Sequence, residues 1–226
     1  MRKTKIITTE DILITLCQSV AAVLSKATGN KVTYSAMVQK ISRTCLKPDV
    51  ACFVLFDGGF NGIVVNNFTS EAAIEIYQDY MKNMGMPESE ISQSYMADDV
   101  SNVLGELMNQ CVGSFTHKIK DELQTNITQS QPKMLVINKS VNISVDTVME
   151  RPQARRVGFT TATNNIFYLE LAMDKTEFIK LHDFELEGEC DPDDIIASSQ
   201  SEKKSHSKTE TIADIADDDF MAELGL

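Results

Sequence analysis

A carboxylate and an amide lie one helical turn apart near the middle of the chain, at Glu106 and Asn109. They belong to residues 101–123, where apolar residues recur every three or four positions, the spacing of a helix with one buried face. At about 100° per residue, both side chains project from the opposite, exposed face of that helix. The pair offers a negative charge and hydrogen-bonding groups to a partner. Exposed helix faces commonly carry Glu and Asn, however, so the pair by itself assigns no function.

Two further residues share this exposed face, Asn102 one turn before Glu106 and Gly113 one turn after Asn109. We call the four residues together the ridge. A glycine inside a helix is less favourable than alanine by roughly 1 kcal/mol. Close approach by a partner is one reason to keep a glycine at such a position. We therefore predict that Asn102 and Gly113 belong to a partner-binding surface around the Glu/Asn pair.

The net charge of −12 is concentrated at the C-terminal end of the chain. Residues 187–226 contain twelve Asp and Glu and three Lys, a charge of −9, which leaves −3 for residues 1–186. This acidic balance argues against nucleic acid and anionic membrane as partners. It favours a protein partner that presents a basic or lysine-bearing groove.

The cysteines and histidines show no spacing typical of a metal site or a disulfide framework. The cysteines are odd in number and widely scattered, which indicates reduced thiols in a cytoplasmic protein: Cys17, Cys45, Cys52, Cys111 and Cys190. The three histidines are isolated, no signal peptide is visible, and no apolar run approaches the roughly 18 residues of a membrane span. We expect a cytoplasmic protein that binds no metal or other cofactor of its own.

Hydrophobic periodicity predicts helices that alternate with groups of strands. Helices are expected over residues 9–28, 70–84 and 97–123, and strands within 31–45, 50–56, 60–66, 133–137, 140–146, 155–162 and 166–172. Residues 175–180 are predicted to form a short helical turn. The order of helix, strands and hairpin occurs twice, with the helix near Asp11 matching the helix near Val100, which indicates a faint internal duplication. We therefore predict an α+β domain over residues 1–186, with long helices packed on an antiparallel or mixed sheet.

The C-terminal region differs in composition from this domain. Residues 187–212 are rich in Ser, Lys and Asp and poor in aromatic residues, the composition of a disordered linker. Residues 213–226 are acidic but regain an apolar pattern. That pattern predicts a peptide that folds as a helix when it meets a hydrophobic groove.

The residues after Asn109 extend the local pattern to a family resemblance. Pro132 follows Asn109 after twenty-two residues, and the resulting E-x2-N-x22-P pattern is similar to the signature of the CheC/CheX/FliY family of response-regulator phosphatases. Residues 105–113, GELMNQCVG, resemble the active helix of that family, and residues 58–76 resemble the segment before it in CheX. The family often has Asp or Ser four residues before the Glu, where this chain has Asn102. The resemblance covers most of residues 9–178.

This resemblance implies a phosphatase that hydrolyses the aspartyl phosphate of a CheY-like response regulator. Asn109 would enter the regulator's active site and orient the attacking water, and Glu106 would pair with a lysine of the regulator. The regulator would supply Mg²⁺, so this chain would bind no cofactor. Hydrolysis of this kind depends on positioning more than on covalent chemistry.

The last nine residues are similar to the C-terminus of CheZ, an unrelated chemotaxis phosphatase that tethers CheY by such a peptide. The residues implied in binding are Asp218, Asp219, Phe220, Met221, Leu224 and Leu226. The linker before this peptide would have an r.m.s. span of about 30 Å. An acidic tail that only aids solubility is the alternative.

Other functions remain open beside the phosphatase. A binding module of the same fold, such as an adaptor or a flagellar-switch component, would bind phosphorylated CheY-like proteins without hydrolysing the phosphate. An unrelated enzyme has little support, because the chain contains no nucleophile elbow, P-loop or Rossmann fingerprint. CheC resembles two copies with two sites, whereas CheX has one site and forms a dimer. The single Glu/Asn motif here therefore implies a CheX-like homodimer.

Overall fold

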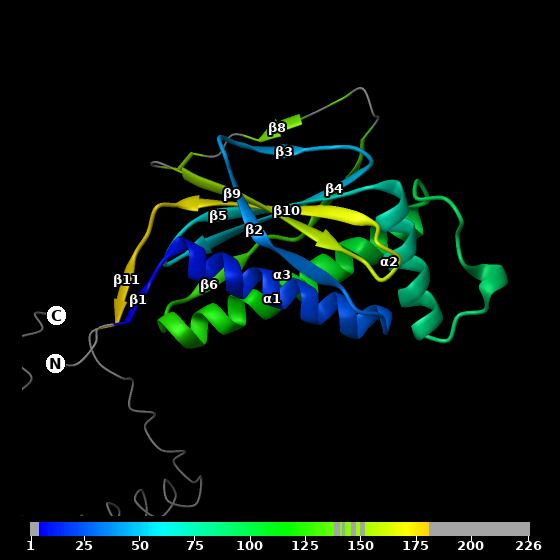
Figure 1. Ribbon diagram of the computed structural model, residues 1–226, viewed down its shortest axis with the longest axis horizontal. Coiled ribbons are helices and arrows are strands. Elements are labelled where there is room, and N and C mark those ends of the chain that lie inside the picture. The colour runs from blue at the N-terminus through cyan, green and yellow to red at the C-terminus, as the bar shows by residue number, and fades with distance from the viewer. Residues whose placement is uncertain (1–4, 138–140, 142, 146–147, 150–151, 181–226) are drawn as a thin grey trace, which may run out of the picture. The chain divides into compact units, whose positions relative to one another are not determined.

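Three α-helices and a large antiparallel sheet make up the part of the chain that the computed structural model describes, residues 5–137, 141, 143–145, 148–149 and 152–180 (Figure 1). The helices are α1 Thr9–Thr28, α2 Ser70–Asn83 and α3 Asp98–Leu123. The strands, in chain order, are β1 Lys5–Ile7, β2 Thr33–Ile41, β3 Thr44–Leu46, β4 Val50–Gly58, β5 Gly62–Phe68, β6 Ile127–Gln129, β7 Lys133–Val136, β8 Ile143–Val145, β9 Pro152–Thr160, β10 Ile166–Asp174 and β11 Phe178–Lys180. The predicted linker and tail, 187–212 and 213–226, lie outside the described residues.

The main sheet has the strand order β2-β9-β10-β5-β4-β6, and every neighbouring pair is antiparallel. β6 and β7 share the outer edge of β4, because β6 pairs with residues 56–58 and β7 with residues 50–53. The helices α1 and α3 cover one face of this sheet, and the small β3–β8 pair lies over the other (Figure 1). The predicted α+β class is therefore confirmed, with an antiparallel sheet.

The strand order also has the two-fold pattern of an internal duplication. Outward from the central β5–β10 pair, β4 and then β6 and β7 lie on one side, and β9 and then β2 lie on the other. In the chain, α1 precedes β2, β4 and β5, and α3 precedes β6, β7, β9 and β10. The equivalent helices α1 and α3 pack against each other (Figure 1). Each half of the chain thus contributes one long helix, two neighbouring strands on one side of the sheet's centre, and the outermost strand or strands at the opposite edge.

Local signals in the sequence set the ends of α1. Thr8 caps its N-terminus through a reciprocal pair of hydrogen bonds with Asp11, and Gly29 ends it with a left-handed backbone, φ 71°. By length and composition alone, α1 would be long and apolar enough to cross a membrane. In the fold its apolar stripe is buried in the core, with Ile12, Leu16 and Val20 fully enclosed. Packing on α3 and the sheet accounts for this apolar stripe.

The core between the helices and the sheet holds α3 in one orientation. Its inward side chains are almost completely buried: Val100, Leu104, Leu107, Met108, Cys111, Val112, Phe115 and Ile119. Phe115 contacts Phe56 of β4 edge to face, with ring centroids 5.8 Å apart. Burying one large apolar side chain contributes about 1.5–3 kcal/mol, so rotation of the helix about its axis would be strongly unfavourable.

Three short strands, β1, β6 and β11, were not expected from the sequence. Residues 175–180, predicted to be a helical turn, instead contain β11, which pairs with β1 from Lys5↔Lys180 to Ile7↔Phe178. β6 forms in a segment that was interpreted only as polar. Each of these strands has three residues, too few for an alternating pattern, and each is stabilised by a partner distant in sequence.

Candidate functional site

The structure places the predicted pair on the exposed face of α3. The buried face of the helix packs on α1 and the sheet, so Glu106 and Asn109 face solvent from consecutive turns. Asn102 is also exposed, and Gly113 is half-buried. The four ridge residues therefore lie on one side of one helix, as their spacing predicted. Their roles in binding or catalysis remain predictions.

A glutamine on the same helix contacts Glu106. The Nε2 of Gln110 donates to Oε1 of Glu106 at 3.0 Å. This is a neutral donor, and no ion pair to Glu106 occurs within the described part of the chain. The carboxylate therefore keeps its charge available for a cation of a partner.

A second glutamine, from β6, contacts Asn109. The Nε2 of Gln129 donates to the side-chain Oδ1 of Asn109 at 2.9 Å and to its backbone oxygen at 3.3 Å. At its other end, the side-chain oxygen of Gln129 lies 3.4 Å from Oγ1 of Thr116, whose one hydroxyl proton is also within reach of the backbone oxygen of Gly113, at 3.1 Å. Gln129 thus connects the central amide of the ridge to the edge of the sheet and to the next turns of α3.

One of the two glycines of α3, Gly105, allows the helix to approach the strands at this edge. A Cβ added at Gly105 would lie 3.3 Å from Cγ of Met134 on β7, which is tighter than an ordinary contact. At Gly113 an added Cβ would meet only Nε2 of Gln129, at 3.9 Å. Gly105 is therefore the position where the absence of a side chain serves packing on the sheet. Gly113 leaves open space beside Gln129, which fits its predicted place in a partner-binding surface.

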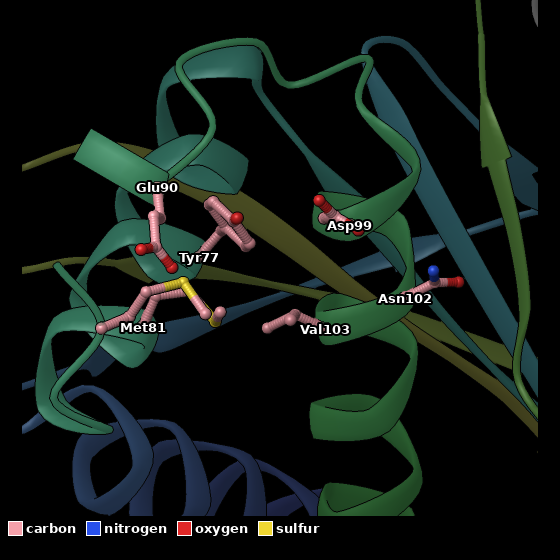
Figure 2. A pocket seen from close by; sticks show the side chains of 7 residues that line it. Tyr77, Met81, Glu90, Asp99, Asn102 and Val103 are labelled. Carbon is pink, nitrogen blue, oxygen red and sulfur yellow. The ribbon is translucent and has the colours of Figure 1, made fainter. Parts of the chain in front are cut away.

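An open hollow of about 260 Å³ lies between α2 and the first turns of α3 (Figure 2). It is lined by Tyr77, Met81, Met86, Glu90, Asp99, Asn102 and Val103. Figure 2 shows Val103 pointing across the hollow toward Met81, whereas the amide of Asn102 projects away on the far side of α3. Asn102 therefore belongs to the exposed face with Glu106 and forms only the rim of the hollow.

The buried cysteine thiols of α1, β4 and α3 are not suited to nucleophilic chemistry. Cys52 of β4 and Cys111 of α3 are buried, as is Cys17 of α1. Burial raises the pKa of Cys17 and Cys52 to about 12 and also raises the pKa of Cys111. These side chains stay protonated near neutral pH and act as small apolar groups in the core.

The equivalent helix α1 carries no second site. Its middle residues are Cys17, Gln18 and Ser19, of which Cys17 and Ser19 are buried. Nζ of Lys118 on α3 donates to Oγ of Ser19 at 3.1 Å, so this part of α1 faces its partner helix. Within the described residues, the Glu/Asn pair thus occurs on one helix of the duplicated fold.

Six predicted site residues lie outside the described chain, and two glutamines that contact the ridge were not predicted. Asp218, Asp219, Phe220, Met221, Leu224 and Leu226 lie beyond residue 180, outside the described residues. Gln110 and Gln129 were not predicted. Gln110 could have been found, because it lies four residues after Glu106 on a helix. Gln129 gave no such signal, because its contact with Asn109 depends on how β6 is placed beside α3.

Comparison with solved structures identifies the fold. It is similar to CheX from Desulfovibrio desulfuricans, with a TM-score of 0.59 and 18% identity over 73% of this chain and 99% of that chain. FliY from Thermotoga maritima is similar over 75% of this chain and 92% of its own, with a TM-score of 0.53 and 17% identity. The CheX-CheY-BeF3-Mg²⁺ complex from Borrelia burgdorferi matches with a TM-score of 0.51 and 15% identity over 73% of this chain and 99% of that chain. The chain therefore has the CheC/CheX/FliY fold.

Within that fold, the sequence belongs to one particular family. The chain is a member of the family described as "Protein of unknown function (DUF3334)", whose model matches residues 3–226. The match includes both the folded domain and the acidic C-terminal region. No curated protein matches the sequence significantly.

Proposed function

We propose that this protein hydrolyses the aspartyl phosphate of a CheY-like response regulator. The observation that carries the proposal is the ridge itself: Glu106 and Asn109, with the spacing of the family motif, are exposed on a helix whose opposite face is anchored in the core. A CheY-like partner is supported by the Borrelia burgdorferi complex, in which a protein of this fold is bound to CheY with BeF3 and Mg²⁺.

The proposed reaction requires only water as a second reactant. The water oxygen forms a bond to phosphorus while the bond from phosphorus to the regulator's aspartate oxygen breaks. The products are a free carboxylate and inorganic phosphate, and the proton of the water passes to the phosphate. Mg²⁺ held by the regulator neutralises charge on the phosphoryl oxygens.

Each residue of the pair has a distinct role in this proposal. Asn109 positions the attacking water by hydrogen bonding, because an amide is too weak a base to remove a proton. Glu106 pairs with a lysine of the regulator and fixes the docked position of α3. Removal of Asn109 should therefore lower the maximal rate, whereas removal of Glu106 should mainly weaken binding.

The test measures loss of phosphate from a phosphorylated CheY-like regulator. The protein should accelerate this loss, and Glu106→Ala should raise KM by about tenfold or more, the factor expected for one charge-assisted pair. A regulator in its beryllofluoride form measures binding without hydrolysis. Binding without any acceleration of phosphate loss would contradict the phosphatase proposal and assign an adaptor or flagellar-switch role instead.

We also propose that the protein is cytoplasmic and forms a homodimer. The dimer proposal rests on β2, an edge of the main sheet whose outer side pairs with no other strand among the described residues. Residues 33–40 of this strand are all exposed, and Met37 is 79% exposed. An apolar strand edge of this kind can pair with a second copy. Met37→Lys should reduce the mass measured by light scattering from that of a dimer to that of a monomer. A dimer that persists in this variant would exclude β2 as the interface.

A further inference from the structure

We propose that Gln129 is a positioning residue that fixes the amide of Asn109 with its carbonyl turned toward the sheet and its NH2 group facing outward. This inference rests on the proposed function for its effect on catalysis. The orientation itself is a property of the free protein and can be measured without a regulator.

The orientation follows from the chemistry of the atoms in contact. The backbone oxygen of Asn109 can only accept hydrogen bonds, so the Gln129 atom that lies 3.3 Å from it must be the NH2 nitrogen. The side-chain atom of Asn109 that lies 2.9 Å from the same nitrogen must then be an acceptor, Oδ1. The assignment of oxygen and nitrogen in both amides is therefore determined by a backbone atom.

Gln129 is itself held from two sides. Its backbone lies in β6, where it pairs with Phe56 of β4. Its side-chain oxygen lies 3.4 Å from Oγ1 of Thr116, in the second turn after Asn109, and shares the proton of that hydroxyl with the backbone oxygen of Gly113 at 3.1 Å. A side chain whose backbone is fixed in a strand and whose end contacts the helix loses less freedom when it binds Asn109.

The effect on Asn109 is a restriction of its last torsion angle. The amide of an exposed Asn rotates over a broad range, with no strongly preferred orientation. The bond from Gln129 occupies one lone pair of Oδ1, and the NH2 group then projects toward solvent with the other lone pair free. The group presented to a docked regulator is thus an oriented N–H donor, which can hold the oxygen of the attacking water.

Two variants of Gln129 test this inference. Gln129→Met keeps the length of the side chain and removes both polar groups, so it frees the Asn109 amide. Gln129→Glu places an acceptor next to Asn109, which favours the reversed amide with NH2 turned inward. We expect a loss in kcat of about tenfold for Gln129→Met, the factor of one net hydrogen bond, and a larger loss for Gln129→Glu. The affinity for the beryllofluoride form of CheY should stay unchanged in Gln129→Met.

A third variant separates hydrogen bonding from charge. Gln131→Glu makes the same change of charge two residues away on an exposed side chain, and it should leave kcat close to that of the unchanged protein. Asn109→Asp retains an acceptor for Gln129 but has no outward donor, so it should be as inactive as Asn109→Ala. If Gln129→Met and Gln129→Glu both keep full kcat while Asn109→Ala is inactive, the inference about Gln129 is wrong and the proposed function stands.

Nuclear magnetic resonance of the free full-length protein tests the orientation independently of activity. The side-chain nitrogen of Gln129 lies within hydrogen-bond distance of both oxygens of Asn109, so its more protected amide proton should exchange with solvent at least about tenfold more slowly than those of Gln131. In Gln129→Met, the Asn109 side-chain nitrogen should become more mobile on the ps–ns timescale. Equal exchange at Gln129 and Gln131 would overturn the inference, whatever the phosphatase assay shows.

Discussion

Glu106 and Asn109 are exposed, yet each accepts a hydrogen bond from a glutamine, Gln110 for the carboxylate and Gln129 for the amide. A side chain already held in one orientation loses less conformational entropy when it binds a partner. The two residues therefore differ from ordinary solvated Glu and Asn side chains in their preorganisation. This preorganisation matters for a reaction in which the chain positions the water and the regulator and contributes no reactive group of its own.

A pH-dependent prediction concerns Glu10, at the start of α1. Its hydrogen bond to Arg155, 2.7 Å long, holds the pKa of Glu10 below the ordinary value of 4.5. A carboxyl whose pKa falls on folding stabilises the folded state above its unfolded pKa, and this stabilisation is lost as the pH falls through the folded value. Glu10→Gln should thus lower the free energy of unfolding at pH 7 by up to about 1 kcal/mol, because the Glu10 side chain is 53% exposed.

Urea unfolding of Glu10→Gln at pH 7 and in acid checks this effect. The difference from the unchanged protein should shrink as the pH falls below 4.5, where Glu10 itself becomes protonated. Glu88→Gln is the matched control, because its 3.5 Å pair with Lys82 joins side chains that are 82% and 50% exposed. A loss of stability that is equal at both pH values would show that packing, and not charge, links Glu10 to Arg155.

At the scale of elements, the two faces of α3 have different surroundings. Its inward face packs on the sheet and α1, and its outward face carries the ridge. Gly105 permits the close approach to β7, whereas Gly113 leaves space beside Gln129. The two glycines of the same helix should therefore respond differently to substitution.

Gly113→Ala should raise the free energy of unfolding by about 0.5–1 kcal/mol, because alanine is the better helix former and its Cβ would make only an ordinary contact at 3.9 Å. Gly105→Ala should raise the free energy of unfolding by less, since its Cβ would lie 3.3 Å from Met134. Chemical denaturation measures both changes.

Gly113→Leu should in addition weaken binding of the beryllofluoride form of the regulator, because its larger side chain covers the ridge. Unchanged binding in that variant would remove Gly113 from the partner-binding surface.

Most of the helices and longer strands could be predicted from local sequence pattern. Both long helices have clear apolar periodicity, and α1 also has a capping residue, Thr8, whereas α3 begins after Ala97 without a side-chain cap. The strand β4 is a nearly continuous apolar run that leads into the hairpin with β5, so these elements were expected. β1, β6 and β11 each have three residues and form only because a distant strand lies beside them. The Glu106/Asn109 pair was found from its spacing along one helix. Gln129 was missed because it meets Asn109 across twenty residues of chain and two different elements.

At the scale of the whole molecule, the charge is divided between a nearly neutral domain and an acidic C-terminal region. Residues 187–226 carry −9 of the net −12. A regulator bound to a tethered peptide would reach an effective concentration of order millimolar at the ridge. The tail would thus increase the frequency of docking without taking part in the hydrolysis.

Deletion of residues 214–226 should accordingly raise the KM for the phosphorylated regulator by at least about tenfold and change kcat much less. The double variant Phe220→Ala, Leu224→Ala keeps the charge of the tail and removes two of its apolar residues. It should reproduce the deletion if the peptide binds through an apolar face. Steady-state dephosphorylation kinetics measure both constants. An unchanged KM in the deletion would show that the tail does not bind the regulator and only aids solubility.

The central claim is that the amide of Asn109 enables hydrolysis on a docked regulator. Its most direct test is the rate of phosphate loss from a phosphorylated CheY-like regulator under saturating single-turnover conditions, measured for the unchanged protein, Asn109→Ala and Asn102→Ala. The account predicts that Asn109→Ala lowers this rate by about 100-fold or more, as expected when a positioning group is lost, while binding of the beryllofluoride form persists. Asn102→Ala, in the predicted partner-binding surface, should weaken binding but keep most of this rate, because the complex is saturated under these conditions. Full activity in Asn109→Ala would contradict the account.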